Sequence, residues 1–256
     1  TDYNSVEYYD GTEWQILEVI EDYNEITKAG LVLHLDASNE ESYPGSGNKW
    51  YDLTSNGNNG TISGPTYVDV DSTKAFEFSL NNHIILGNLG TLNAPFTVEY
   101  FGKFKTASQV DYEYFGSVGN TGTNAMMSVS RTGTRSPGEN NGPAGLLYIY
   151  PGFGGTILYD VDLANTDWHH IVVRALPSSP FLEVYHNGRK ASLHPSTSQS
   201  PSGAINTNGI FRIGQWQNGT WDLNGFIGKH AIYDRALTPG EIWKNYVALA
   251  PRFGIN

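Results

Sequence analysis

The stretch WYDLTSNGNNG, from Trp50 to Gly60, decides the fold, because an apolar pair leads directly into a run of asparagine and glycine. Three interpretations compete for it: a metal-binding loop, a ligand-binding loop and a sharp turn. Its middle, Asp52-x-Thr54-x-Asn56-Gly57, follows the start of a calcium-loop pattern that needs a glutamate at position twelve. That position is Ser63, so this calcium loop is rejected. The remaining interpretation is a tight turn over Trp50, with Asp52 either capping it or sharing a calcium ion.

Composition favours β structure and excludes two kinds of site. The 256 residues include 16 tyrosines, 11 phenylalanines, 6 tryptophans and 29 glycines, whereas only 16% of residues are charged. Aromatic strand formers with many turn formers are typical of all-β domains, and the length suits one large domain or two small ones. The chain has no cysteine, which excludes disulfides and thiolate metal sites.

The charge argues against nucleic acid as a partner. The net charge is −11, from 26 acidic and 15 basic residues, and it would repel phosphate. No apolar run approaches the roughly 20 residues that span a bilayer, so we expect no membrane insertion. The sequence begins at Thr1 rather than methionine, and we expect a processed chain or part of a longer one.

Two units are expected along the chain. Residues 6–9 and 12–17 flank Asp10-Gly11, a dipeptide favoured in tight hairpin turns, and an acidic stretch follows. We therefore predict an N-terminal hairpin and connector over 1–28 and one domain over 29–256.

The second unit shows many short strands separated by turns. Asn-Gly pairs begin at positions 56, 59, 141, 187, 208, 218 and 224, as expected for hairpin turns. This spacing predicts an all-β, antiparallel jelly-roll sandwich. The segments expected to form strands are 31–37, 75–79, 83–87, 96–104, 145–150, 156–161, 169–176, 181–188, 210–214 and 226–237.

The clearest strand is FTVEYFGKF, residues 96–104, whose side chains alternate between two faces. Phe101 interrupts the otherwise polar face that carries Glu99, so we expect that face to be partly covered.

One short C-terminal helix is also predicted. Thr238, Pro239 and Glu241 have the spacing of a capping box with proline at the first helical position. Ile242 and Tyr246 then supply an apolar stripe.

In chain order, these segments resemble the laminin-G-like, concanavalin A-like jelly-roll domains. The most specific pieces are Trp50-x-Asp52-Leu53 with Asn56-Gly57-Asn58, and Ile232-Tyr233-x-Arg235-Ala236-Leu237. The match runs from about Gly30 to Tyr246, which is most of the chain.

The two ends resemble a narrower group. YNSVEYYDGTEW, near the N-terminus, is similar to the hairpin that precedes C-terminal modules of tailed-phage structural proteins. IWKNYVALAPRFGI is similar to the closing segment of laminin-G-like modules in virion proteins of marine and cyanobacterial phages. The resemblance implies a location on the virion surface, in a fibre, spike or capsid ornament, with other virion proteins as partners. Phage fibres are often trimeric, so we expect a homo-oligomer, with a trimer as one arrangement; the apolar tail could pack on a neighbour or close its own sandwich.

The resemblance also implies a structural calcium ion as one interpretation of three aspartates. Other folds of this kind hold calcium with carboxylates at the rim, and Asp36, Asp52 and Asp234 each lie where a strand meets a turn. The alternative is that these carboxylates cap turns. No cofactor is otherwise required.

Catalysis is not expected. Glucanases with this fold carry acidic residues at alternate positions of a strand, and retaining chemistry needs carboxyls about 5 Å apart. The nearest runs here are Asp111-x-Glu113 and Asp160-x-Asp162, each with only two carboxylates beside an expected turn. The adjacent His169 and His170 should point to opposite faces of a strand, one packed and the other half exposed.

Saccharide binding remains as the expected activity. Sugars bind by stacking on aromatic rings while polar groups take the hydroxyls. Trp216 and Trp221 lie in a polar, glycine-rich loop, where two core tryptophans would be unusual. A second group surrounds YIYPGFGGTILYD and comprises Tyr148, Tyr150, Phe153 and Tyr159. We expect these rings to form an exposed aromatic surface; the alternative is that they pack in the sandwich or against a neighbouring subunit.

Together these inferences predict a non-enzymatic virion surface protein with a lectin-like module that attaches to host-surface carbohydrate. One alternative is a carbohydrate-active enzyme or its accessory carbohydrate-binding module. Another is an architectural virion protein without a glycan ligand.

Overall fold

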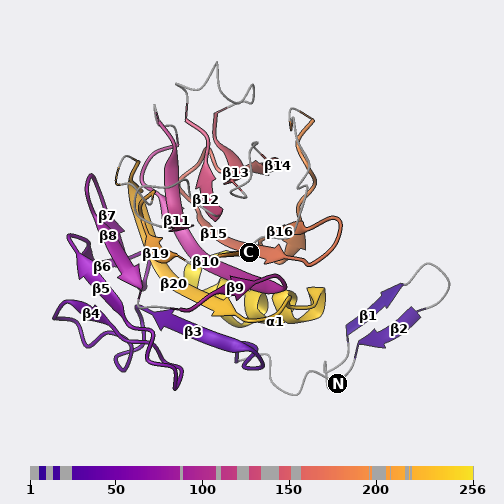
Figure 1. Cartoon of the computed structure of the whole chain (residues 1–256), viewed down its shortest axis with the longest axis horizontal. Coiled ribbons are helices and arrows are strands. Elements are labelled where there is room, and N and C mark those ends of the chain that lie inside the picture. Colours follow the sequence, from indigo (N-terminus) through magenta and orange to yellow (C-terminus); the bar gives the residue numbers. More distant parts are fainter. Residues whose placement is uncertain are drawn as a thin grey trace.

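The computed structural model describes residues 6–9, 14–17, 25–86, 89–107, 111–119, 127–133, 144–150, 157–195, 197, 206–207, 209–216, 219 and 221–255. Two eight-stranded antiparallel sheets form the body of the molecule (Figure 1). The first sheet has the order β17 (Arg189–Lys190), β16 (Leu182–His186), β15 (Trp168–Ala175), β10 (Phe96–Phe104), β20 (Gly225–Tyr233), β7 (Thr73–Phe78) and β6 (Thr66–Val70), with β3 (Leu31–Asp36) also paired to β20. The second has the order β14 (Ile157–Asp162), β13 (Leu146–Tyr150), β12 (Met127–Arg131), β11 (Glu113–Gly119), β19 (Ile210–Ile213), β8 (His83–Leu86), β5 (Gly60–Ser63) and β4 (Lys49–Trp50).

Two small elements complete the strand inventory of the described residues. β1 (Val6–Tyr9) and β2 (Trp14–Leu17) form a separate antiparallel pair, as predicted, whereas the expected Asp10-Gly11 turn lies outside the described residues. β9 (Leu92–Asn93) pairs with β18 (Asn206–Thr207). The prediction of an antiparallel jelly-roll sandwich is confirmed.

The main core lies between the two large sheets. Trp50 is fully buried there, with its ring centroid 4.8 Å from that of Phe76. Phe104 and Phe115 meet across the sheets at 4.7 Å. Burial of large apolar side chains such as these is worth roughly 1.5–3 kcal/mol each, so the interleaved rings account for much of the sandwich's stability.

Several strands were not predicted from the sequence, among them β11 and β12. Their sequences, EYFGSVG and MSVSR, contain small polar residues that are typical of loops. Both strands are nonetheless buried along their whole length, and each pairs with strands on both sides. Glu113, expected beside a turn, instead begins β11.

The Trp50–Gly60 stretch is a turn capped by Asp52. Its carboxylate accepts hydrogen bonds from the backbone amides of His34, Thr54 and Asn58 at 3.0 Å each, and from the Thr54 hydroxyl at 2.7 Å. The Asn58 side chain donates to the Val32 carbonyl at 3.0 Å, which ties the same turn to β3. The capping interpretation of Asp52 is therefore confirmed.

Replacing Asp52 by alanine should destabilise the fold by about 1–3 kcal/mol, because partly buried amides lose their acceptor. Asp69→Ala is the matched control: Asp69 is exposed on β6 and, within the described part of the chain, pairs with Lys74 alone, so its loss should cost under about 0.5 kcal/mol. Urea unfolding followed by tryptophan fluorescence measures both. Equal losses would contradict the capping role, and a wild-type midpoint that falls when EDTA replaces calcium would indicate a bound metal instead.

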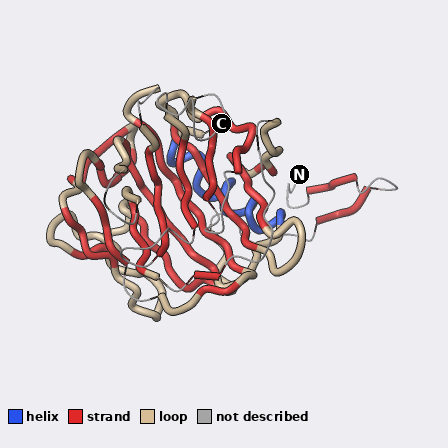
Figure 2. The backbone as a smooth tube through the Cα atoms, turned by 45° about the horizontal axis from the view of Figure 1, so that its top comes forward, coloured by secondary structure: helices blue, strands red, loops and turns tan. Residues whose placement is uncertain are grey.

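The helix α1 (Pro239–Leu249) covers the outer face of the first sheet (Figure 2). The predicted capping box is present, with Thr238 accepting from the Glu241 amide and the Glu241 carboxylate accepting from the Thr238 amide. Ile242 and Tyr246 are buried as expected. The tail folds back through the 3-10 helix η1 (Ala250–Phe253), where Phe253 stacks on Phe101 at 4.7 Å, so the tail closes its own sandwich.

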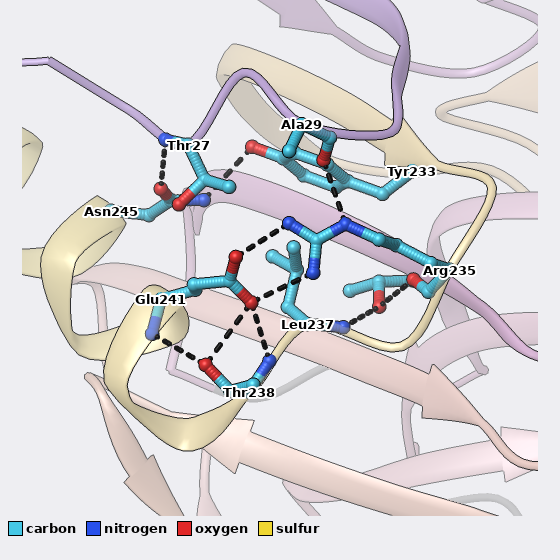
Figure 3. A network of polar contacts seen from close by, with 9 residues as sticks. Thr27, Ala29, Tyr233, Arg235, Leu237, Thr238, Glu241 and Asn245 are labelled. Atoms are coloured by element: carbon cyan, nitrogen blue, oxygen red, sulfur yellow. Dashed lines mark hydrogen bonds and ion pairs between the residues drawn. The ribbon is translucent and has the colours of Figure 1, made fainter.

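Polar contacts join the start of the domain to its end (Figure 3). The Asn245 amide oxygen accepts from the backbone amide of Thr27 at 2.7 Å. Arg235 donates to the Ala29 carbonyl and forms a two-pronged ion pair with Glu241. Thr27 and Ala29, which precede β3, are thereby fixed against α1 and the segment that leads into it.

Beneath the helix lies a fully buried charge, Glu99 of β10. Its carboxylate accepts hydrogen bonds from His170 at 2.7 Å, and from Lys229 and Asn245 at 3.2 Å each. Burial alone would raise the pKa of Glu99, but Lys229 and His170 together hold that pKa well below its ordinary value. Phe101 lies on the same face, which confirms that this face is covered.

Glu99→Gln should destabilise the protein by about 3–5 kcal/mol, because it leaves the Lys229 ammonium buried without its counter-charge. Adding Lys229→Met to this variant should recover part of the loss, since the unpaired charge is removed. The pKa of Glu99 is lower in the folded than in the unfolded chain, so its stabilising contribution is complete above about pH 4.3 and is lost as the pH falls below it. Urea unfolding across pH 3–7 tests this; additive losses in the double variant would contradict it.

Candidate functional site

An aromatic cluster lies on the outer face of the second sheet. Strand alternation directs Phe115, Leu147 and Ile149 into the main core and their neighbours outward. The outward rings form what we call the tyrosine–tryptophan cluster, which consists of Tyr112, Tyr114, Tyr148, Tyr150, Trp216 and Trp221. It lies over β11, β12 and β13, neighbouring strands in the upper part of Figure 1.

The rings of the cluster contact one another. Trp216 and Trp221 lie edge to face with centroids 5.9 Å apart. Tyr114 lies 5.0 Å from Trp216 and 6.2 Å from Trp221, and Tyr150 meets Trp216 edge-on at 5.8 Å. Tyr112 connects Trp221, at 6.0 Å, with Tyr148, at 5.3 Å. The two tryptophans are therefore supported from below by tyrosines on the strands.

A pinned hairpin positions the tryptophans between β19 and β20. The Trp216 amide donates to the Trp221 carbonyl at 2.8 Å, and the amide of Leu223 donates to the carbonyl of Gly214 at 2.8 Å. Gly214 has a φ of +79°, and a β-carbon there would lie 2.2 Å from the Phe78 ring, so glycine is required.

Polar side chains hold the base of this hairpin. The Gln215 amide donates to Asp222 at 2.8 Å, and the other Asp222 oxygen accepts from the Asn81 amide at 3.0 Å. The Ser117 hydroxyl donates to the Gln215 carbonyl at 2.9 Å. These contacts fix the hairpin that carries the two tryptophans.

The structure brings four of the five predicted aromatic residues together and corrects the expected exposure. Trp216, Trp221 and Tyr150 are half-buried. Tyr148 is buried, because Tyr112 packs against it. Tyr159 does not belong to the cluster: it points to the opposite face of β14, into the main core. Phe153 lies outside the described residues.

Tyr112 and Tyr114 were not singled out from the sequence. Their alternate spacing in DYEYFGSVG was a usable signal, since it places both on one face of a strand. Because β11 itself was not predicted, that signal was not recognised.

The acidic pairs considered for catalysis are in different situations. Glu113 is buried and ion-paired with Arg131, whose guanidinium lies 3.9 Å above the Phe104 ring. Asp160 and Asp162 are exposed on the edge strand β14, and Asp162 accepts the Ala164 amide at 2.7 Å. A buried, paired glutamate is unsuited to acid–base chemistry on a polymer.

The adjacent histidines are both buried, so the expectation of one half-exposed ring is wrong. They do point to opposite faces: His170 meets Glu99 under α1, whereas His169 meets His186 at 3.0 Å. Burial, with a smaller effect of His186, lowers the pKa of His169 to about 3. The reason for the burial is that α1 covers one face of β15 and the second sheet covers the other.

The three aspartates proposed as calcium ligands do not meet at one point. Asp36 pairs with Arg252 at 2.9 Å, and Asp52 caps its turn. Asp234 is exposed beside Gly30, six residues from Asp36 along β3, or about 20 Å at the rise of a strand. Among the residues that the structure describes, no group of three or more His, Cys, Asp or Glu side chains could hold a metal ion.

Residues 78–243, more than half of the chain, match the laminin-G type family described as the concanavalin A-like lectin/glucanases superfamily. The chain therefore belongs to this superfamily. A search of curated proteins returned no match. Among the described helices, none has the length and apolar character needed to cross a membrane.

Solved structures share the fold at low identity. Trypanosoma rangeli sialidase is 15% identical with a TM-score of 0.59; the alignment covers 89% of this chain but only 34% of the sialidase. Domain 4 of AbnA, an extracellular arabinanase of Geobacillus stearothermophilus in complex with arabinotriose, is 18% identical with a TM-score of 0.58 over 86% of this chain and all of that domain. The binding domain of Paraclostridial Mosquitocidal Protein 1 is also 18% identical, with a TM-score of 0.55 over 85% and 52% of the two chains.

Tyr148→Ala should destabilise the fold by about 3–5 kcal/mol, as expected when a buried aromatic side chain is truncated. Trp221→Ala, at a half-buried position, should cost clearly less. Tyr148→Phe is the matched control that keeps the ring. Chemical unfolding measures all three; a larger loss for Trp221 than for Tyr148 would show that the loop, rather than the strand, holds the cluster together.

Proposed function

We propose that this chain is a non-enzymatic saccharide-binding module on the outside of a virion, where it attaches the particle to host-surface carbohydrate. The membership in the lectin/glucanase superfamily supports the saccharide, and the resemblance of the two chain ends to phage structural modules supports the virion. Its partners would be other virion proteins, host glycans and further copies of itself.

The observation that carries the proposal is the half-buried ring surface of Trp216, Trp221 and Tyr150 on the outer face of the second sheet. Aromatic faces stack on the C–H faces of sugars, and nearby amides and carboxylates take the hydroxyls. The hairpin that carries the tryptophans is held in place by the hydrogen bonds of Asp222 and Gln215. A rigid arrangement of this kind lowers the entropic cost of binding.

The burial and pairing of the acidic residues support a function without catalysis. Glu113 is committed to Arg131, and Glu99 is fully buried under α1. Asp160 and Asp162 are exposed on the edge strand β14, and Asp162 accepts a hydrogen bond from the Ala164 amide.

An accessory module of a carbohydrate-active enzyme is the second candidate. The specific observation in its favour is the fold shared with AbnA domain 4, a complete domain that was solved with arabinotriose. In that case the ligand would be a polymer substrate rather than a host receptor, while the same aromatic cluster would bind it.

A glycan array followed by calorimetry tests the proposed site. Wild-type protein should bind at least one glycan, and Trp216→Ala or Trp221→Ala should weaken that binding tenfold or more, about 1.4 kcal/mol, because each variant loses a stacking ring. Tyr51→Ala, at an exposed tyrosine of a different loop, is the matched control and should bind as wild type.

Three outcomes would contradict this proposal. Binding to no glycan would favour an architectural protein, and unchanged binding by both tryptophan variants would displace the site. Turnover of a polysaccharide that is lost in Asp160→Asn would show an enzyme.

Antibodies against the domain should label intact virions; labelling of a secreted enzyme instead would support the second candidate.

A further inference from the structure

A hollow of about 630 Å³ lies at the edge of the sandwich, between β14, the turn after β16 and the helix α1. Residues 190–192 separate it from a neighbouring hollow of about 530 Å³. The chain crosses between the two sheets here, since Tyr159 bridges to Leu193 and the Asp160 amide donates to the Ser192 carbonyl at 2.9 Å. Both volumes fall in the range of small-ligand sites.

The helix supplies an aromatic wall to the first hollow. Trp243 and Tyr246 lie with their ring centroids 5.3 Å apart, and Trp243 is half-buried. Gly188 packs against both rings: a β-carbon there would lie 2.7 Å from Trp243 and 2.9 Å from Tyr246, and its φ is +75°. The glycine lets the turn reach the rings, and the next residue, Arg189, therefore lies beside them.

Arg189 brings an uncompensated positive charge. It is exposed, and among the residues that the structure describes its guanidinium has no ion-pair partner. Lys190 differs, because its ammonium is held by Glu183 at 2.5 Å. Burial lowers the pKa of His186, opposite Arg189 in the register, to about 4, so this ring is neutral at pH 7.

Groups suited to sugar hydroxyls complete the lining. Asn187 lines the hollow; its side-chain oxygen accepts the His170 amide at 3.0 Å, so its side-chain nitrogen is the donor that remains for a ligand. Asp160 is exposed on β14 and can accept. Among the described lining residues, Asp160 is also the one carboxylate.

We propose that this hollow binds an acidic saccharide, independently of the tyrosine–tryptophan cluster. The sugar ring packs against Trp243, and its carboxylate pairs with Arg189 through two parallel hydrogen bonds, the geometry that guanidinium favours. The hydroxyls bind Asn187 and Asp160. The adjoining hollow accommodates further sugar residues, so the ligand is an oligosaccharide.

The charges select this class of ligand. A neutral sugar leaves Arg189 without a counter-charge. Asp160 and the negative net charge of the whole chain repel a densely sulfated or phosphorylated polymer. A saccharide with a single carboxylate is repelled less.

Calorimetry with matched probes tests the proposal. Sialyllactose and lactose form one pair, and trigalacturonic acid and galactotriose form the other. At least one acidic probe should bind, with its neutral counterpart at least tenfold weaker. Arg189→Met should weaken the acidic probe at least tenfold, whereas Arg189→Lys should lose less, because the charge remains while the two-pronged geometry is lost.

Two controls keep the result interpretable. Lys49→Met removes an exposed cation from β4, in the other sheet, and should bind as wild type. Arg189→Met should melt at the wild-type temperature, since no side-chain partner of Arg189 is found among the described residues. Trp216→Ala should retain the acidic probe, even where it abolishes binding at the tyrosine–tryptophan cluster.

Any of four results overturns the proposal. These are no binding of either acidic probe, equal binding of acidic and neutral probes, unchanged binding by Arg189→Met, and loss of the acidic probe in Trp216→Ala. The last result would place the acidic ligand at the cluster and leave the proposed function standing.

Discussion

The structure depends on the compensation of one buried charge, the carboxylate of Glu99. Removing a carboxylate from water costs several kcal/mol, and the cost is offset only when all of its partners are in place. Those partners come from three other elements: His170 from β15, Lys229 from β20 and Asn245 from α1. The apolar contacts of the sandwich tolerate small shifts, whereas this network does not. It therefore specifies where the helix lies on the first sheet, and through Thr27 how the chain enters the domain.

A second ion pair fixes the side of the molecule that carries the aromatic cluster. Glu113 and Arg131 join β11 to β12, and Glu113 also accepts the Asn224 amide at 3.0 Å, directly before β20. The hairpin with Trp216 and Trp221 runs from β19 to that point, so both of its ends are anchored on paired strands. A binding surface built on such a scaffold keeps its shape without a ligand, and less free energy is lost in ordering it.

The two proposed sites both rest on aromatic rings, and the hollow beside α1 adds the positive charge of Arg189. One lies on the outer face of the second sheet and the other at the sandwich edge, so a single long glycan or two chains of one surface could engage both. Two weak contacts on one module, repeated in an oligomer, would add up to firm attachment through effective concentration.

The sequence by itself determined the fold class, the turn at Asp52 and the helix cap at Thr238, because each depends on neighbouring residues: alternation, turn formers and a capping box. It also indicated that Trp216 and Trp221 lie outside the main core, in a polar loop. Only the tertiary structure decided that Tyr148 is buried, and that β11, rich in small residues, is a central strand. Burial depends on which segments distant in sequence cover a face, and no local pattern records that. For the same reason the hollow at Arg189 cannot be predicted from the sequence: β14, β17 and α1, which line it, are distant along the chain.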